Sequence, residues 1–299
     1  MYMNTNTRIL APEFAFARPE SLAEAFALLK EHGPGARLLA GGTDLLVQMK
    51  MERLSPDLVI SLSGVKELEG IAAGDGLTIG AATTIWEISK SPVVGEQLPA
   101  LREACNAYST VSIMFMGTIG GNLCNASPAA DTAPALLVHD ASVVIKSVRS
   151  ERTVPLAEFF TGPGKTVLKP GEIVTAVAVP KPATGTGSAF LKISRVVADI
   201  SQVCAAVSLV RDGARVTGCR IALGSVGPTP VRAARAEAEL TGRDGTPQAF
   251  AKAAAIVSED IRPITDVRAS ETYRRHVART LVRDALQTAW QRAGEGVSK

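Results

Sequence analysis

The stretch Gly117-Thr118-Ile119-Gly120-Gly121-Asn122, here called the second glycine segment, organises the middle of the chain. Its three glycines stand between apolar runs, and small polar residues follow as far as Asp131. Glycine reaches backbone angles closed to other residues and lets a ligand approach the main chain, and successive free N–H groups in such a loop bind anions. The stretch alone leaves two interpretations open: a loop that holds a phosphate group, or a tight turn packed under a helix.

A similar pattern, here called the first glycine segment, occurs earlier as Ala40-Gly41-Gly42-Thr43-Asp44-Leu45-Leu46. The apolar run at residues 36–40 predicts a short buried strand that leads into the glycine pair. Helical spacing begins at Leu45, and Thr43 or Asp44 could cap that helix. Helix N-termini and free loop amides both attract phosphates. An ordinary strand-to-helix connection is the alternative interpretation.

Apolar periodicity and turn residues predict further elements around the two segments. Helices are expected to begin after Ser21, at Thr84 and at Pro99, with a short one at residues 133–137. Strands are expected at residues 57–61, 77–81, 142–148 and 171–180. This mixture of strands and helices predicts an α+β fold for the first part of the chain.

A domain boundary is predicted at residues 182–187, which have the Pro-, Gly- and Thr-rich composition of a linker. It divides the chain into residues 1–181, with subdomains of roughly 1–61 and 62–181, and residues 182–299. After the boundary come three strand-like segments, residues 188–194, 202–210 and 215–225, and then three helices, residues 231–240, 247–258 and 270–291. The second domain is therefore also expected to be α+β, with a three-stranded sheet followed by helices.

Composition limits the classes of function. The 299 residues carry a net charge of +3 without a block of like charge, which argues against a nucleic-acid or membrane-surface footprint. Aromatic residues make up only 4%, so base-stacking platforms are not expected. No apolar run reaches the length of a membrane span. Met1 to Arg8 are polar and predict no signal peptide, so a cytoplasmic location is expected.

Several chemical motifs are missing from the sequence. Neither a Gly-x-Gly-x-x-Gly dinucleotide fingerprint in a strand–helix setting nor a Gly-x-x-x-x-Gly-Lys-Ser/Thr phosphate loop is present. A Gly-x-Ser-x-Gly nucleophile elbow is also missing. No metal site is expected, because metal-ligand spacing is absent among Cys105, Cys124, Cys204, Cys219, His32, His139 and His276. The cysteines are interpreted as buried or partly buried free thiols, and no catalytic acid–base residues are identified.

Taken together, the two glycine segments resemble those of the FAD-binding subunits of molybdenum hydroxylases. This group includes the medium subunit of carbon monoxide dehydrogenase, the flavin domain of xanthine dehydrogenase and the β subunit of 4-hydroxybenzoyl-CoA reductase. The resemblance extends from the Pro19-Glu20-Ser21-Leu22 helix start to the C-terminal helices. It implies a two-subdomain FAD-binding domain, similar to that of vanillyl-alcohol oxidase, followed by a C-terminal sheet with helices.

The resemblance also implies which residues bind the cofactor. Residues 40–46 and 117–122 would hold the FAD pyrophosphate through two converging sets of backbone N–H groups. Asp131 matches an aspartate near the ADP ribose, and a helix N-cap is its alternative role. The remaining implied residues are Val174, on a strand beside the adenine part, Lys192, near the flavin ring, and Ile200, over one face of the isoalloxazine. For Lys192 a solvated strand lysine, and for Ile200 core packing, are the alternatives.

As a family member, this chain would be an electron-transfer flavoprotein subunit without hydroxylation chemistry of its own. A large partner subunit would hold the molybdenum cofactor, and a small one would carry two [2Fe–2S] clusters, as a dimer of heterotrimers. Electrons would pass from those clusters through FAD to an external acceptor such as NAD, oxygen or a quinone. The cysteine-rich insertion of the 4-hydroxybenzoyl-CoA reductase subunit is absent between Asn122 and Asp131, so no cluster is expected in this chain.

Two alternatives remain open from the sequence. A stand-alone FAD-dependent oxidoreductase of the same flavin-binding fold, such as UDP-N-acetylenolpyruvoylglucosamine reductase, would act on its own substrate. A non-enzymatic binding module would need no flavin. The strands and helices of the C-terminal region favour the molybdenum hydroxylase subunit.

Overall fold

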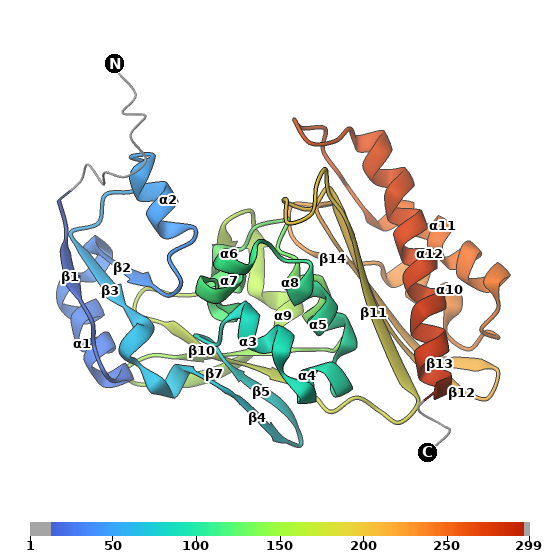
Figure 1. Cartoon of the computed structure of the whole chain (residues 1–299), viewed down its shortest axis with the longest axis horizontal. Helices are drawn as coiled ribbons and strands as arrows, with labels where there is room; N and C mark the ends of the chain where they lie inside the picture. Colours follow the sequence, from blue (N-terminus) through green and yellow to red (C-terminus); the bar gives the residue numbers. More distant parts are fainter. Residues whose placement is uncertain (1–12, 296–299) are drawn as a thin grey trace.

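The computed structural model describes residues 13–295 and contains three larger sheets arranged along the length of the molecule, together with one two-stranded sheet (Figure 1). The N-terminal elements lie at one end, the C-terminal helices lie at the other, and a five-stranded sheet with its helices lies between them (Figure 1). The signal-peptide prediction concerns Met1 to Arg8, which lie outside the described residues. Within residues 13–295, no helix combines the length and apolar character needed to cross a membrane.

The first sheet is parallel and places the first glycine segment at its edge. Its strands are β1 (Ala15–Ala17), β2 (Ala36–Leu39) and β3 (Leu58–Ser61), in the order β1-β3-β2. Helix α1 (Leu22–His32) begins where the Ser21 side chain accepts a hydrogen bond from the Glu24 amide, and a 3₁₀ turn, η1 (Gly33–Gly35), follows it. Helix α2 (Leu45–Lys50) follows the glycine pair, so the predicted strand–turn–helix succession is confirmed.

The second sheet is antiparallel, with strand order β4-β5-β10-β6-β7. Its strands are β4 (Ile71–Gly74), β5 (Gly76–Gly80), β6 (Ser142–Lys146), β7 (Glu151–Pro155) and β10 (Ile173–Val179). Its helices are α3 (Ile85–Lys90), α4 (Pro92–Gln97), α5 (Pro99–Asn106), α6 (Val111–Met116), α7 (Ile119–Asn125), α8 (Thr132–Leu137) and α9 (Leu156–Phe159). Short turns η2 (Leu62–Gly64) and η3 (Lys66–Leu68) and the ribbon β8 (Phe160–Gly162) with β9 (Lys165–Thr166) complete this region.

The second glycine segment differs from its prediction as a loop, because residues 119–122 form the first turn of α7. Thr118 is the N-cap, and its side-chain oxygen accepts a hydrogen bond from the Gly121 amide at 3.0 Å. Ile119 and Leu123 are fully buried on the inner face of the helix. A Cβ on Gly120 would lie 2.7 Å from the Ala81 carbonyl oxygen, so the glycine permits close packing of α7 against the sheet.

The C-terminal sheet has four strands, so the prediction of three is wrong. Its strands are β11 (Thr186–Ile193), β12 (Val203–Asp212), β13 (Arg215–Gly224) and β14 (Val231–Arg232), in sequential order. The fourth strand pairs only two residues with β13. One of them is Val231, which the sequence predicts at the start of a helix. That helix, α10 (Ala234–Leu240), begins later, and α11 (Pro247–Asp260) and α12 (Glu271–Glu295) follow. Helix α12 packs along β11 and β12 (Figure 1).

The cysteine interpretation is confirmed. All four cysteines are free thiols; Cys105, Cys204 and Cys219 are buried, and Cys124 is half-buried. In the part of the chain that the structure describes, no group of three or more His, Cys, Asp or Glu side chains is arranged to hold a metal ion.

Candidate functional site

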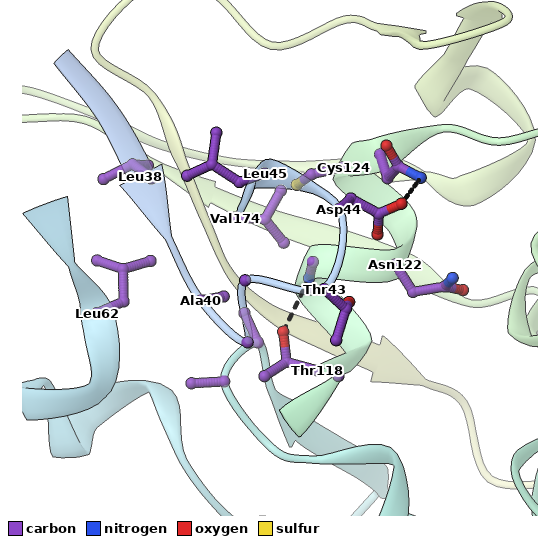
Figure 2. Close-up of a pocket in the computed structure, with 18 of the residues that line it drawn as sticks. Leu38, Ala40, Thr43, Asp44, Leu45, Leu62, Thr118, Asn122, Cys124 and Val174 are labelled. Atoms are coloured by element: carbon purple, nitrogen blue, oxygen red, sulfur yellow. Dashed lines mark hydrogen bonds between the residues drawn. The ribbon is translucent and has the colours of Figure 1, made fainter. Parts of the chain in front are cut away.

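A cavity of about 380 Å³ lies between the first and second sheets and is lined by both glycine segments. The segments touch directly, because a Cβ on Gly41 would lie 3.0 Å from the Gly117 main-chain nitrogen and only 1.7 Å from the carbonyl oxygen of Met116, the residue before it. A second link joins their helices, because the Asn125 side-chain Nδ2 atom donates to the Asp44 carboxylate at 3.0 Å (Figure 2). The two stretches that the sequence singled out therefore form one wall.

The first glycine segment presents free backbone donors. Within residues 13–295, the four main-chain N–H groups of residues 41–44 donate to no protein acceptor, and the first bond into α2 is Leu46 N–H to the Gly42 carbonyl at 3.1 Å. Gly42 has φ +74°, a conformation that favours glycine and helps to turn successive amides toward one side. Consecutive free amides of this kind form an anion-binding concavity. This segment has the donors that a pyrophosphate requires.

The second glycine segment contributes differently from expectation, because five of its six main-chain N–H groups already have partners, Thr118 being the exception within residues 13–295. The amides of Ile119 and Gly120 donate to the carbonyls of Thr83 and Ala81 at 3.1 and 2.9 Å. The amide of Gly121 donates to the Thr118 side chain. The expected pair of converging N–H sets is thus reduced to one set. The second segment supplies a close, side-chain-free surface at Gly121.

A hydrogen-bond relay fixes the polar groups at one end of the cavity. Thr132 is fully buried, and its hydroxyl contacts the Asn122 Oδ1 atom at 2.6 Å. The hydroxyl hydrogen needs an acceptor, and this oxygen is the one available, which orients the Asn122 amide. The Asn122 Nδ2 atom then donates to the Tyr108 hydroxyl oxygen at 3.2 Å. The Tyr108 hydroxyl hydrogen is left to donate into the cavity.

The two ends of the cavity differ in polarity. Leu38 and Leu62 lie on one side, and Asp44 and Asn122 lie on the other (Figure 2). Burial is the main cause that raises the pKa of Tyr108 to about 12, and the nearby carboxylates of Asp44 and Asp131 raise it further. The phenol therefore remains a neutral donor at physiological pH.

Asp131 and Lys192 form a buried ion pair behind this end of the cavity. The Lys192 Nζ atom donates to the Asp131 Oδ2 atom at 2.7 Å, and the two side chains are 5% and 6% exposed. Lys192 also donates to the Ala107 main-chain oxygen at 2.9 Å. Burial raises the pKa of Asp131 to about 6, although the Lys192 charge acts to lower it. Asp131 occupies the N-cap position of α8, but its side chain makes no capping hydrogen bond.

Comparison with protein families gives two matches that together span nearly the whole chain. Residues 12–182 match the FAD binding domain in molybdopterin dehydrogenase, and residues 188–289 match the CO dehydrogenase flavoprotein C-terminal domain. The chain belongs to the FAD-binding medium subunits of the molybdenum hydroxylases. It is thus a flavoprotein subunit of oxidoreductase complexes of this family.

Individual members of the molybdenum hydroxylase family align with the chain over its length. The carbon monoxide dehydrogenase medium chain of Hydrogenophaga pseudoflava is 34% identical over 285 residues, which cover 95% of this chain and 99% of the relative. The xanthine dehydrogenase FAD-binding subunit of Escherichia coli O157:H7 is 34% identical, covering 94% and 97%. A solved structure of the Hydrogenophaga pseudoflava enzyme superposes with a TM-score of 0.91 at 35% identity, covering 95% of this chain and 99% of that chain.

Most of the residues that the sequence indicated for FAD line the cavity of this medium subunit. They are Ala40, Gly41, Gly42, Thr43, Asp44, Leu45, Gly117, Thr118, Gly120, Gly121, Asn122 and Val174. Val174 lies beside a β-bulge between Val174 and Ala176, where the register of β10 against β6 shifts. Leu46, Ile119, Asp131 and Lys192 are not lining residues, and Ile200 lines a different cavity.

The cavity of the medium subunit also contains residues that the sequence did not indicate. These include Tyr108, Arg37, Gln48, Cys124 and Asn125. Arg37 supplies a cationic side chain. It lies on β2, the strand that leads into the first glycine segment, and a basic residue so close to that segment is the signal that could have identified it as a lining residue. Tyr108 has no such local signal, because its role depends on contacts with Asn122 that form only in the folded chain.

Proposed function

We propose that this chain binds FAD in the cavity between its first two sheets and passes electrons from the [2Fe–2S] clusters of a partner subunit to an external acceptor. The row of four free amides at residues 41–44 carries the proposal, since it opens on a cavity that both glycine segments line. A pyrophosphate is a dianion whose oxygens accept such hydrogen bonds, and backbone donors can neutralise it without a metal. FAD, when bound, supplies the redox chemistry.

The chain's own residues would bind and orient the cofactor. Residues 40–46 would hold the pyrophosphate, with Gly121 leaving room for it. The Tyr108 hydroxyl would donate to an acceptor atom of the cofactor, held in place by Asn122 and Thr132. Val174 would lie against the adenine part. Asp131 and Lys192 would act from behind the cavity, since in this structure Lys192 donates to Asp131 Oδ2, while the buried Asp131 Oδ1 atom has no hydrogen-bond partner among residues 13–295.

The wider assignment follows from the family. We propose a large partner with the molybdenum cofactor and a small partner with two [2Fe–2S] clusters, assembled as a dimer of heterotrimers in the cytoplasm. The relative named a medium chain matches this chain over 99% of its own length, which supports a subunit over a stand-alone oxidoreductase. The family matches also support a division into residues 1–181 and 182–299.

The proposal predicts that the purified chain carries a single FAD and that removing it uncouples the assembled complex. In the FAD-stripped complex, substrate should still reduce the iron–sulfur clusters, while reduction of the external acceptor should fall by at least about 100-fold, since no redox centre then connects the two. Cluster spectra and acceptor turnover measure the two steps separately, and added FAD should restore turnover. Undiminished acceptor turnover without FAD would contradict the proposal, and oxidation of a substrate by the isolated chain would support the stand-alone alternative.

A further inference from the structure

A second cavity, also of about 380 Å³, lies where the C-terminal region meets the central region. The central region contributes Ser127, Pro128, Ala129 and Pro163. The remaining lining residues come from loops after β11, β13 and α11, apart from Arg274, which lies in the first turn of α12. The two regions are joined here by a hydrogen bond of 2.7 Å from the Ser225 amide to the Pro128 carbonyl. Ligand sites occur preferentially at such boundaries between domains.

Three residues in the lining of this cavity each contain a buried, unpaired side-chain atom. In residues 13–295, seven buried side-chain nitrogen or oxygen atoms have no hydrogen-bond partner, and three of them belong to lining residues: Ser201 Oγ, Arg268 Nε and Arg274 Nε. Ser201 is 1% exposed. A buried polar group without a partner costs free energy, and all three atoms can donate.

The charge of the lining favours an anion. Its ionisable residues are Arg262, Arg268, Arg274 and Asp266. Arg274 donates to Asp266 at 2.7 Å and to the main-chain oxygens of Gln202 and Ser225 at 2.6 and 3.0 Å, so its terminal nitrogens serve the fold. Arg262 donates to main-chain oxygens at the end of α11.

Arg268 is the arginine that remains available. Its closest carboxylate contact is Asp266 at 3.7 Å, and its side chain is 32% exposed. Its backbone is fixed, because the Gln202 side chain donates to the Arg268 carbonyl at 2.6 Å. Arg195 and Asp199, in the loop after β11, pair with each other at 2.8 Å, so they leave the excess positive charge of the lining in place.

We propose that this second cavity binds a small organic oxyanion, with a phosphate or carboxylate group at Arg268 and an apolar body against the surrounding walls. Those walls are apolar: Pro128, Pro163, Ile200, Pro228 and Ile264. Guanidinium groups bind both oxyanions strongly, because the hydrogen bonds are charge-assisted. The site is distinct from the first cavity and does not depend on the proposed role of FAD.

Calorimetric titration of the full-length, FAD-loaded chain tests this site with phenyl phosphate, benzoate and neutral benzamide. We expect saturable binding of at least one anion, at least about tenfold weaker binding of benzamide, and an unchanged flavin content. The anion that binds more tightly identifies the natural group. Arg268→Gln should weaken anion binding at least about tenfold and preserve the fold, because its guanidinium has few contacts. Ser201→Ala should leave anion binding unchanged, because the Ser201 hydroxyl is buried.

Arg235→Gln is the matched control, since Arg235 is an exposed arginine that pairs with Glu259 on the helical side of the same domain. It should bind both anions as the unmodified chain does. The proposal is overturned if neither anion binds saturably, if benzamide binds as tightly as the anions, or if Arg268→Gln leaves anion affinity unchanged. Displacement of FAD by the anions would place them in the first cavity and would also overturn it.

Discussion

Gly121→Leu is expected to abolish FAD retention while the chain stays folded. A Cβ at Gly121 would meet only the Thr118 side-chain oxygen at 2.9 Å and the Ala40 Cβ at 3.8 Å, so the leucine side chain would extend into the cavity. Since the cofactor would need that volume, we expect FAD affinity to fall by at least about 100-fold, or about 2.7 kcal/mol. Flavin fluorescence during titration with FAD measures the affinity, and circular dichroism measures folding.

Gly74→Leu is the matched control for this substitution. Gly74 ends strand β4 at an exposed hairpin, and a Cβ there would meet nothing within 4 Å. It should therefore retain full FAD occupancy, whereas Gly41→Leu would be a poor test, because the Met116 carbonyl blocks that site in the folded chain itself. If Gly121→Leu purifies with as much FAD as Gly74→Leu, the cavity does not hold the pyrophosphate.

Local signals were sufficient to predict much of the fold around the cavity. Residues 36–50 were predicted as strand, glycine turn and helix because apolar periodicity changes from that of a strand to that of a helix on either side of Gly41 and Gly42. Composition predicts the domain boundary at residues 182–187, and β11 begins at Thr186, within that range. Strand β14 was missed because it is defined only by the pairing of Val231 and Arg232 with β13. The local sequence does not show that these two residues lie beside that strand.

The prediction of a loop at residues 117–122 failed for a different reason. Glycine is a poor helix former, so Gly120 and Gly121 favoured a loop, but tertiary packing against Ala81 requires the missing side chain. A capping signal was present in Thr118, which accepts from the Gly121 amide as an N-cap does. As a consequence, the site has one set of free amides where two were expected.

The part of the site that depends on distant pairing could not be predicted. Asn122 was indicated by its place in the segment, but its partner Thr132 and the resulting orientation of Tyr108 require α7, α8 and the end of α5 to pack together. Asp131 and Lys192 were each assigned separately to the cofactor. Their contact joins residues 61 positions apart, across the predicted domain boundary.

Lys192→Met is expected to destabilise the chain by about 3 kcal/mol at about pH 8, because it leaves the Asp131 carboxylate buried without its partner. Methionine has a similar length and no charge, so loss of packing should contribute little. Adding Asp131→Asn to Lys192→Met should recover most of the loss, because the double variant buries no charge at this position. Denaturant unfolding of the single and double variants measures the effect, and equal stability of Lys192→Met and the unmodified chain would contradict it.

The loss of folding stability caused by Lys192→Met should also depend on pH and should grow as pH rises. Burial raises the pKa of Asp131 to about 6 in the folded chain, above the unfolded value of about 3.9. The folded carboxyl therefore holds its proton more tightly, and its contribution to stability is complete below the unfolded pKa and is lost as pH rises through the folded pKa. Without Lys192, which lowers this pKa, the loss should continue to higher pH.

The Lys192→Met variant should thus approach the unmodified chain in stability near about pH 5 and be less stable than it above about pH 6. A pH-independent difference would show that Lys192 acts through packing, and Asp131→Asn should remove this titration altogether.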